Sequence, residues 1–367
     1  MGLWQGPLEE VEVNTRFWHD RRVFLTGHTG FKGAWCALVL TQLGARVTGY
    51  ALAPATSPNL FESAGLGREM PSVIGDIRDR ERLRSALLES QADVVVHMAA
   101  QSLVTVGYEK PVETYAINAA GTAAIVDVVR ACQRTRALVV ITSDKCYRLR
   151  DPAARYAESD PLGGRDPYSA SKAAAEYVVA GMRAPFVQAR SESASLQVAT
   201  ARAGNVIGGG DWAKDRLVPD LINAFRAGKE ALVRHPDAIR PWQHVLEPIY
   251  GYLELAQVLY ERAGFARAWN FGPAAAHERS VGWIADRVAS EWGESAAWKR
   301  TAASVYEAPA LRLDSSAARA KLGWAPALDL ETSLAWTVSW YKQFAAGRHA
   351  RELTLADIER YRSLVAA

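Results

Sequence analysis

The chain has 367 residues, which is enough for one large domain or two interlocked domains around a sizeable core. Its 43 basic and 40 acidic residues give a net charge of +3 without a long basic run, so nucleic acid is not an expected partner. The three cysteines form no CxxC pair, the N-terminus has no apolar segment typical of a signal peptide, and no apolar run approaches the ~20 residues of a membrane span. These features predict a cytoplasmic protein with no membrane partner, and no metal site is expected.

A dinucleotide-binding element is predicted near the N-terminus. Residues 22–26 form a short apolar strand, residues 34–43 form a helix, and a GxxGxxG loop joins them. Glycines in this context bring backbone N–H groups close to a pyrophosphate at the helix N-terminus, with a ligand-free glycine turn as the alternative. His28 and Lys32 either neighbour the phosphates or are solvated. The predicted cofactor contacts in this loop are Gly27, His28, Thr29, Gly30, Phe31, Lys32 and Gly33.

The next two strands bear on the choice of cofactor. The strand 46–51 ends near Tyr50, where a dinucleotide fold usually places an Asp or Glu for the adenosine ribose, and no arginine cluster replaces that acid. The choice between NAD and NADP is therefore weakly determined, and loose binding is expected. Asp76 and Ile77, at the end of a third strand, are predicted to flank the adenine; the alternative for Asp76 is a cap on the helix 79–90.

Two further apolar strands, 92–98 and 137–142, have the composition of strands buried on both faces of a parallel sheet. Between them, a long helix is predicted from Pro111 to Cys132. The later strand ends in Ser143, Asp144 and Lys145. Because ligands of open α/β sheets bind at the carboxyl ends of the strands, three reactive side chains in a row indicate an active site more than a polar turn.

Tyr168 and Lys172 stand four residues apart, at the start of a helix predicted to reach Met182 and to end before Pro185. Residues at this spacing share one helical face. A nearby ammonium lowers the pKa of a tyrosine, which can then take a proton from a sugar hydroxyl while a hydride leaves the same carbon. YxxxK alone is a common spacing, and an exposed pair on an amphipathic helix is the alternative.

Five strand–helix units before residue 190 predict an α/β fold with a doubly wound parallel sheet of the Rossmann type. A further strand covers residues 196–203 and leads into a loop at 205–212. A helix covers 247–262, and a strand at 268–271 returns to the sheet. Outside these segments strands and helices no longer alternate regularly, and helices are predicted at 215–227, 283–292 and 334–344. We expect a Rossmann domain over residues 1–204 plus the returning segment 244–272. A smaller, interleaved substrate domain would cover residues 205–243 and 273–367.

Several strings of residues carry a family resemblance. The glycine loop, residues 97–102, Asn118 with Gly121 and Thr122, Ser143 and the YxxxK pair resemble the extended short-chain dehydrogenase/reductase superfamily of nucleotide-sugar enzymes over about residues 20–345. Within it, residues 27–33, 142–147 and 240–245 are similar to CDP-D-glucose 4,6-dehydratases, the last string being the most specific. The resemblance implies NAD as the cofactor. Besides the glycine loop, the implied contacts are Asp76, Ile77, Ala99, Ala100, Gln101, Asn118, Tyr168 and Lys172.

The resemblance implies that CDP-D-glucose loses water to give CDP-4-keto-6-deoxy-D-glucose. Tyr168, helped by Lys172 and Ser143, removes the O4 proton while a hydride passes from C4 to NAD; Asp144 protonates the C6 hydroxyl, and the hydride returns to C6. The dTDP-glucose dehydratases are similar but carry Asp-Glu, so Lys145 stands where their Glu would be. Lys145 is either the C5 base, if burial and Lys172 lower its pKa, or an electrostatic stabiliser of the enolate.

The contacts with the nucleotide sugar are predicted to come mainly from polar residues of the second half of the chain. A guanidinium fork matches a diphosphate, with a surface salt bridge as the alternative for each arginine, and the histidine is either a contact or structural. As in the superfamily, helices 111–132 and 168–182 are expected to pair across a two-fold axis in a homodimer or homotetramer. The predicted substrate contacts are Ser102, Asn205, Arg216, Arg240 and His244.

Other functions remain open from the sequence. A 4,6-dehydratase for another nucleotide sugar would use the same residues. A 4-epimerase or simple dehydrogenase would need Tyr168 and Lys172 but gain nothing from Asp144 and Lys145. A non-catalytic NAD-binding regulator should lack Tyr168 or Lys172, and both are present.

Overall fold

The centre of the protein is a seven-stranded parallel sheet, seen in a computed structural model that describes residues 14–187, 196–302 and 306–366. Its strand order is β10-β6-β5-β4-β1-β2-β3. The order reverses between β1 and β4, which is the switch point where doubly wound sheets bind their ligands. The strands are β1 (Arg22–Thr26), β2 (Arg46–Ala51), β3 (Ser72–Ile74), β4 (Val94–His97), β5 (Ala137–Ile141), β6 (Gln197–Ala203) and β10 (Ala268–Phe271).

The sheet is covered by helices on both faces, which explains its continuous apolar strands. Along β1, Val23 and Leu25 belong to one hydrophobic cluster and Phe24 to the cluster on the opposite face. Helices α2 (Phe31–Gln42) and α10 (Leu246–Glu261) contact one face. Helices α4 (Arg80–Ser90), α7 (Gly121–Ala131) and α8 (Pro167–Val187) contact the other. The predicted α/β Rossmann class is confirmed.

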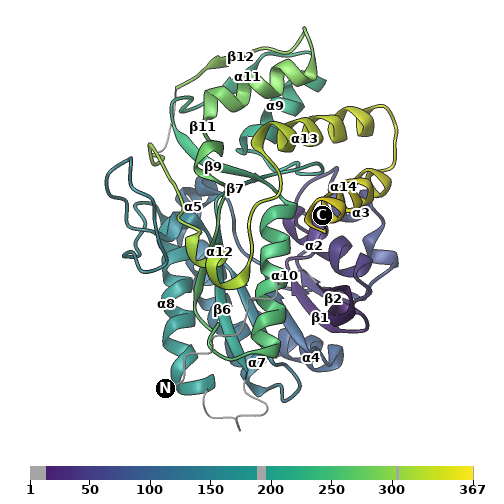
Figure 1. Ribbon diagram of the computed structural model, residues 1–367, viewed down its shortest axis with the longest axis vertical. Coiled ribbons are helices and arrows are strands. Elements are labelled where there is room, and N and C mark those ends of the chain that lie inside the picture. Colours follow the sequence, from purple (N-terminus) through teal and green to yellow (C-terminus); the bar gives the residue numbers. More distant parts are fainter. Residues whose placement is uncertain (1–13, 188–195, 303–305, 367) are drawn as a thin grey trace.

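A second group of elements sits over the carboxyl ends of the central strands, at the top of Figure 1. It contains a three-stranded sheet, β11-β9-β7, and a two-stranded sheet, β12-β8. The strands are β7 (Asn205–Ile207), β8 (Ala231–Val233), β9 (Ile239–His244), β11 (Glu278–Ser280) and β12 (Trp298–Arg300). The helices are α9 (Leu217–Arg226), α11 (Val281–Trp292) and α13 (Leu330–Ala345), followed by α14 (Ala350–Val365), which packs against α2. The division of the chain into two domains stays a prediction.

Several predicted elements have different limits in the structure. The helix expected from Pro111 is continuous but has a π-helical turn, with α6 (Pro111–Tyr115), η2 (Ala116–Ala120) and then α7. Helix α8 passes through Pro185 to Val187, so the predicted end before Pro185 was wrong; near a C-terminus a proline removes one backbone hydrogen bond without stopping the last turn. The loop predicted at 205–212 begins with a strand, β7, so that prediction was wrong for residues 205–207; residues 240–244, for which no element was predicted, belong to β9. The shorter helices are α1 (Thr15–Trp18), α3 (Leu60–Ser63), η1 (Leu66–Arg68), α5 (Val104–Glu109), η3 (Asp144–Cys146), η5 (Ala275–His277) and α12 (Ser316–Leu322).

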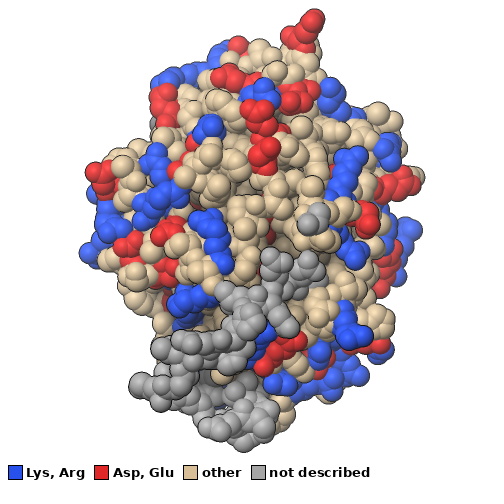
Figure 2. All heavy atoms as spheres, viewed as in Figure 1, with Lys and Arg blue, Asp and Glu red and all other residues tan. Residues whose placement is uncertain are grey.

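The surface carries charges of both signs. On the face shown in Figure 2, acidic and basic side chains are interspersed, in keeping with the small net charge. Within the described residues, none of the helices is both long and apolar enough to cross a bilayer. Most of the N-terminal segment predicted to lack a signal peptide, residues 1–13, lies outside the described part.

Candidate active site

A cavity of about 620 Å³ opens at the carboxyl ends of β1, β4, β5 and β6, between the central sheet and the second group of elements. This is the edge where the switch point of the sheet lies. The predicted site residues that line it are Gly27, Thr29, Gly30, Phe31, Lys32, Gly33, Asp76, Ile77, Ala99, Ala100, Gln101, Ser102, Ser143, Asp144, Lys145, Tyr168, Lys172, Asn205, Arg216 and Arg240. Three predicted residues lie outside this lining: His28, Asn118 and His244.

The glycine loop has the close packing that a dinucleotide cradle requires. A β-carbon added at Gly33 would lie 2.0 Å from the Gly27 carbonyl oxygen, and one at Gly27 would lie 2.7 Å from the Ala99 nitrogen. Gly27 also has a φ of 79°, which favours glycine. Helix α2 begins at Phe31 with Gly30 as an N-cap that has no side-chain hydrogen bond, so the first N–H groups of the helix are available at the cavity. The loop therefore fits a pyrophosphate.

The two polar side chains of this loop point to different places. Lys32 lines the cavity, and burial, aided by the charges of Arg216 and Lys172, lowers its pKa to about 8. His28 is fully buried behind the loop, where Nε2 hydrogen-bonds to Ser72 Oγ at 2.7 Å, and burial lowers its pKa to about 4. Neither alternative expected for the His28 side chain, contact with the phosphates or exposure to solvent, agrees with this position, because its imidazole packs the loop against β2 and β3.

The adenosine end of the cavity has no acidic residue at the end of β2. Leu52 and Ala53 line the cavity there, and the hydroxyl of Tyr50 donates to the carbonyl of Asp76 at 2.8 Å. The Asp76 carboxylate is paired with Arg78, and the cap of α4 is Asp79, which accepts from Arg82 N at 3.1 Å. Asp76 is thus free of the capping role considered as its alternative.

Asn118 holds the loop after β4 in place from behind. Its amide accepts from Gln101 N and donates to Gln101 O, both at 2.9 Å, and donates to Ser171 Oγ at 2.9 Å. It sits in the π-turn, a local irregularity that often marks functional sites. Asn118 therefore positions Gln101 and lies outside the cavity lining, so the predicted direct cofactor contact is not supported.

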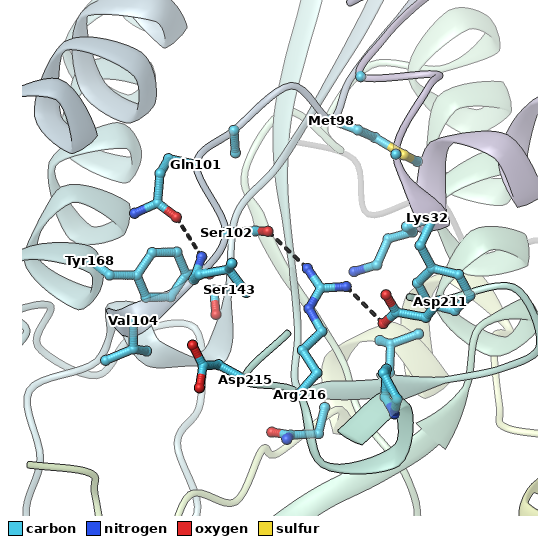
Figure 3. A pocket seen from close by; sticks show the side chains of 18 of the residues that line it. Lys32, Met98, Gln101, Ser102, Val104, Ser143, Tyr168, Asp211, Asp215 and Arg216 are labelled. Carbon is cyan, nitrogen blue, oxygen red and sulfur yellow. Dashed lines mark hydrogen bonds and ion pairs between the residues drawn. The ribbon is translucent and has the colours of Figure 1, made fainter. Parts of the chain in front are cut away.

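The three side chains predicted for the oxidation step line the same cavity, and two of them, Tyr168 and Ser143, are hydrogen-bonded to each other. Tyr168 and Lys172 come from α8, and Ser143 follows β5; Figure 3 shows the phenol ring of Tyr168 directed at Ser143. Burial raises the pKa of Tyr168 to about 12, and a hydrogen bond with Ser143 acts in the opposite direction. Burial lowers the pKa of Lys172 to about 8. The predicted lowering of the Tyr168 pKa is not what the protein alone shows, because burial is the largest influence on this phenol and raises its pKa.

Asp144 and Lys145 occupy a 3₁₀ turn directly after Ser143, beside the same cavity. Asp144 is only 2% exposed; its Oδ1 accepts from Ser143 Oγ at 3.0 Å, and Oδ2 has no hydrogen-bond partner among the described residues. Burial raises the pKa of Asp144. Lys145 Nζ lies 3.9 Å from Oε1 of Glu307, a cavity residue that the sequence reasoning missed because it comes from a distant segment.

The predicted substrate residues divide into two groups. Arg216 reaches across the cavity, donating to Asp211 Oδ2 and to Ser102 Oγ, both at 2.8 Å (Figure 3). Asp211 was not predicted, and no motif in the sequence identifies it. Arg240 is buried and paired with Glu307. His244 is fully buried between Trp35 and Trp336, outside the cavity lining, which favours the structural alternative for it.

Metal ligation has no candidate within residues 14–187, 196–302 and 306–366, where no group of three or more His, Cys, Asp or Glu side chains is suitably arranged. The three cysteines are buried, and none of them forms a disulfide within the described residues.

Comparison with known proteins gives concordant results. Residues 24–337 match the family described as GDP-mannose 4,6 dehydratase. The chain is 46% identical over 354 residues to a CDP-glucose 4,6-dehydratase of Salmonella typhimurium, covering 96% of this chain and 99% of that protein. It is 26% identical over 337 residues to a dTDP-glucose 4,6-dehydratase of Xanthomonas campestris, covering 86% and 92%.

Solved structures show the same fold at lower identity. A UDP-glucose-4-epimerase of Stenotrophomonas maltophila, with bound NAD and formylated UDP-arabinopyranose, has a TM-score of 0.77 at 21% identity and covers 89% of this chain and 100% of that one. A double mutant of DesIV, a dTDP-glucose 4,6-dehydratase of Streptomyces venezuelae with NAD and DAU bound, has a TM-score of 0.74 at 22% identity, covering 88% and 97%.

Proposed function

The chain belongs to the GDP-mannose 4,6-dehydratase family and is an NAD-dependent nucleotide-sugar 4,6-dehydratase, and on this premise we propose which of its residues convert CDP-D-glucose to CDP-4-keto-6-deoxy-D-glucose with loss of water. The 46% identity to a CDP-glucose 4,6-dehydratase, over nearly the full length of both chains, supports this nucleotide sugar over the dTDP, GDP and UDP sugars named for other relatives.

The observation that carries the function is the environment of Asp144. A carboxyl buried to 2% exposure, with its pKa raised by burial and one oxygen unpaired among the described residues, is suited to hold a proton and give it away. Elimination of water from C5 and C6 needs such an acid. A 4-epimerase or a simple dehydrogenase does not, and a non-catalytic regulator would need neither this acid nor Tyr168.

The glycine loop, Ile77, residues 99–101 and Lys172 are proposed to hold NAD. The packing of Gly27, Gly30 and Gly33 around the N-terminus of α2 supports the pyrophosphate position. Bound there, NAD supplies a hydride acceptor for C4 and returns the hydride to C6 within one cycle.

The side chains divide the proton transfers between two sets. Tyr168 takes the proton from O4 of the sugar, with Ser143 hydrogen-bonded to it. Burial raises the pKa of this phenol, and a Lys172 ammonium in the same cavity acts in the opposite direction. The C4 ketone makes the C5 proton acidic. Loss of that proton gives an enolate, and Asp144 protonates the C6 oxygen so that it leaves as water. Lys145 acts beside it, as base or as stabiliser of the enolate.

The nucleotide sugar is proposed to be held across the cavity by Ser102, Asn205 and Arg216. Asp211 and Ser102 fix the guanidinium of Arg216 from two sides, which prepares it for a diphosphate. Arg240 faces Glu307 within the same lining, so we assign it a supporting role there.

We also propose a cytoplasmic homodimer or homotetramer built through helices 111–132 and 168–182. Large apolar or aromatic side chains are exposed on these segments, Val112 by 82% and Tyr177 by 60%. The three cysteines are buried and form no disulfide among the described residues, which agrees with a reducing compartment.

The function is tested by incubating the purified protein with NAD and, in turn, the CDP, dTDP, GDP and UDP derivatives of glucose, and weighing the products. CDP-glucose should lose the mass of one water with no net reduction of NAD. A product of unchanged mass would indicate an epimerase, and faster loss of water from another nucleotide sugar would show that the nucleotide assignment is wrong.

A further inference from the structure

A second carboxylate stands beside Lys145, and no step assigned to Tyr168 or Asp144 uses it. Glu307 lines the cavity with its side chain 32% exposed. Its Oε1 lies 3.9 Å from Lys145 Nζ, and its Oε2 accepts from an Arg240 nitrogen at 3.2 Å. The Glu307 carboxylate therefore lies next to Lys145, the residue that directly follows Asp144, in the cavity where we propose that elimination takes place.

The position of Glu307 is fixed by strand β9. Ile239 donates from its backbone to Pro309 O at 2.9 Å and accepts from Leu311 N at 3.1 Å, so the segment after Glu307 runs alongside β9. Arg240, the next residue of the strand, is 2% exposed and donates to Ile239 O at 2.9 Å as well as to Glu307. A buried guanidinium held at two points leaves the Glu307 carboxylate little freedom to turn away from the cavity.

The pKa values of the two carboxyl groups, Asp144 and Glu307, are shifted in opposite directions. Burial raises the pKa of Asp144, which favours its neutral form. At Glu307 burial acts in the same direction, but attraction to Lys145 and Arg240, with a further contribution from His235, outweighs it and lowers the pKa. Two carboxyl groups whose pKa values are pushed apart in one site are the usual signature of an acid and a base.

Lys145 is less suited to accept a proton than its position in the sequence suggests. An ammonium paired with a carboxylate has three N–H donors and no lone pair. It can still attract the negative charge that develops on O4.

We infer that Glu307 is the base that removes the C5 proton and that Lys145 stabilises the resulting enolate, an inference that rests on the proposed dehydratase function. A lone pair of the Glu307 carboxylate bonds to the C5 proton, and the C5–H electrons form a C4–C5 double bond with the negative charge on O4. The enolate then re-forms the ketone and shifts its double bond to C5–C6 as the C6–O bond breaks. Asp144 gives its proton to the departing oxygen, which leaves as water, and Glu307 returns a proton to C5 when the hydride reaches C6.

The primary test compares Glu307→Gln with the wild type in heavy water, with CDP-glucose and NAD. Glutamine keeps the shape of the side chain but cannot take the proton. Formation of reduced cofactor should remain within a few-fold of the wild type, whereas deuterium incorporation at C5 and release of product should slow by about 10²–10⁴-fold, the usual effect of losing a general base. C5 exchange within threefold of the wild-type rate would overturn the assignment.

Glu278→Gln is the matched control. Glu278 lies on β11, beside β9, and is also held by two cations, Arg155 at 2.8 Å and Arg312 at 3.0 Å, but it is outside the cavity lining. Its replacement disturbs a similar pair of ion pairs in the same part of the fold, so C5 exchange should stay near the wild-type rate. An equal slowing in both variants would mean that Glu307 acts only through the stability of this region.

Two further measurements separate a base from a residue that only positions Lys145. If Glu307 acted solely through Lys145, the double variant Lys145→Met/Glu307→Gln would exchange C5 as fast as Lys145→Met alone; we expect it to be slower by at least tenfold. In an Asp144→Asn background, where the oxidised sugar should accumulate, C5 exchange should be nearly constant between pH 6 and 9. A rise of about tenfold per pH unit would identify a neutral amine as the base and overturn the inference.

Failure of the proposed function gives a different result. If the wild-type enzyme removes no water from CDP-glucose, the dehydratase assignment fails at the first step. If the wild type removes water and Glu307→Gln does so equally fast, only the assignment of Glu307 fails.

Discussion

Replacing Asp144 with asparagine should separate oxidation at C4 from loss of water. Asparagine keeps the size of the side chain but has no proton of carboxyl acidity to give to the C6 oxygen. Removing a general acid costs about 10²–10⁴-fold, or roughly 3–5 kcal/mol of barrier. Asp144 is 2% exposed, so bulk water cannot easily replace it, and the neighbouring Glu307 has a lowered pKa and is ionised. We therefore expect a loss of at least about 10³-fold in water release.

Stopped-flow absorbance and mass spectrometry would measure this effect. After mixing with CDP-glucose, Asp144→Asn should accumulate reduced cofactor and the 4-keto-glucose derivative, because Tyr168, Lys172 and Ser143 remain in place. Tyr168→Phe is the comparison, since it lacks the hydroxyl that accepts the O4 proton and should form no reduced cofactor. Turnover of Asp144→Asn at the wild-type rate would refute the assignment of the acid.

Stability provides a control for the same variant. The folded protein raises the pKa of Asp144, so this carboxyl favours folding below its unfolded pKa of about 4, and that contribution is lost as the pH rises through the folded value. Asparagine stays neutral throughout. The variant should therefore have a Tm no lower than the wild type near neutral pH, and a large fall in Tm would attribute the lost activity to unfolding.

Three other predictions follow from the cavity and the core. Because no acidic residue ends β2, added NAD should raise the activity of purified enzyme and NADP should raise it less; tight, full NAD occupancy after purification would contradict this. In Gly33→Ala the new β-carbon would lie 2.0 Å from Gly27 O, so the glycine loop must shift. Calorimetric titration should show that the affinity for NAD falls at least tenfold, with little change in the affinity for CDP-glucose. Unchanged NAD affinity would show that this loop does not bind the pyrophosphate. Burial raises the pKa of Glu247 to about 7, so this carboxyl favours folding below pH ~4.5 and loses that contribution as the pH rises to about 7. Across this pH window the stability of Glu247→Gln relative to the wild type should rise by up to about 3 kcal/mol, measured by chemical unfolding. A stability difference that does not depend on pH would contradict the raised pKa as the cause.

The sequence by itself was sufficient for the central sheet and for most of the site. Apolar strands followed by helices, the GxxGxxG loop and the i,i+4 pair Tyr168 and Lys172 are local patterns, and the rules of parallel sheets convert them into positions at one edge. Five of the seven central strands were predicted to within one residue at each end or closer. The same patterns brought Ser143, Asp144 and Lys145 to the cavity, because they directly follow a buried strand.

Tertiary structure decided what depends on direction, burial and distant neighbours. His28 is in the predicted loop, but its ring turns behind the loop to Ser72, and Asn118 supports Gln101 from outside the cavity. Burial is the largest influence on the pKa of Tyr168 and raises it, and the four-residue spacing to Lys172 in the sequence does not predict this burial. Glu307 reaches Lys145 because the segment that follows it pairs with β9, and no local pattern encodes a meeting of residues so far apart in the chain.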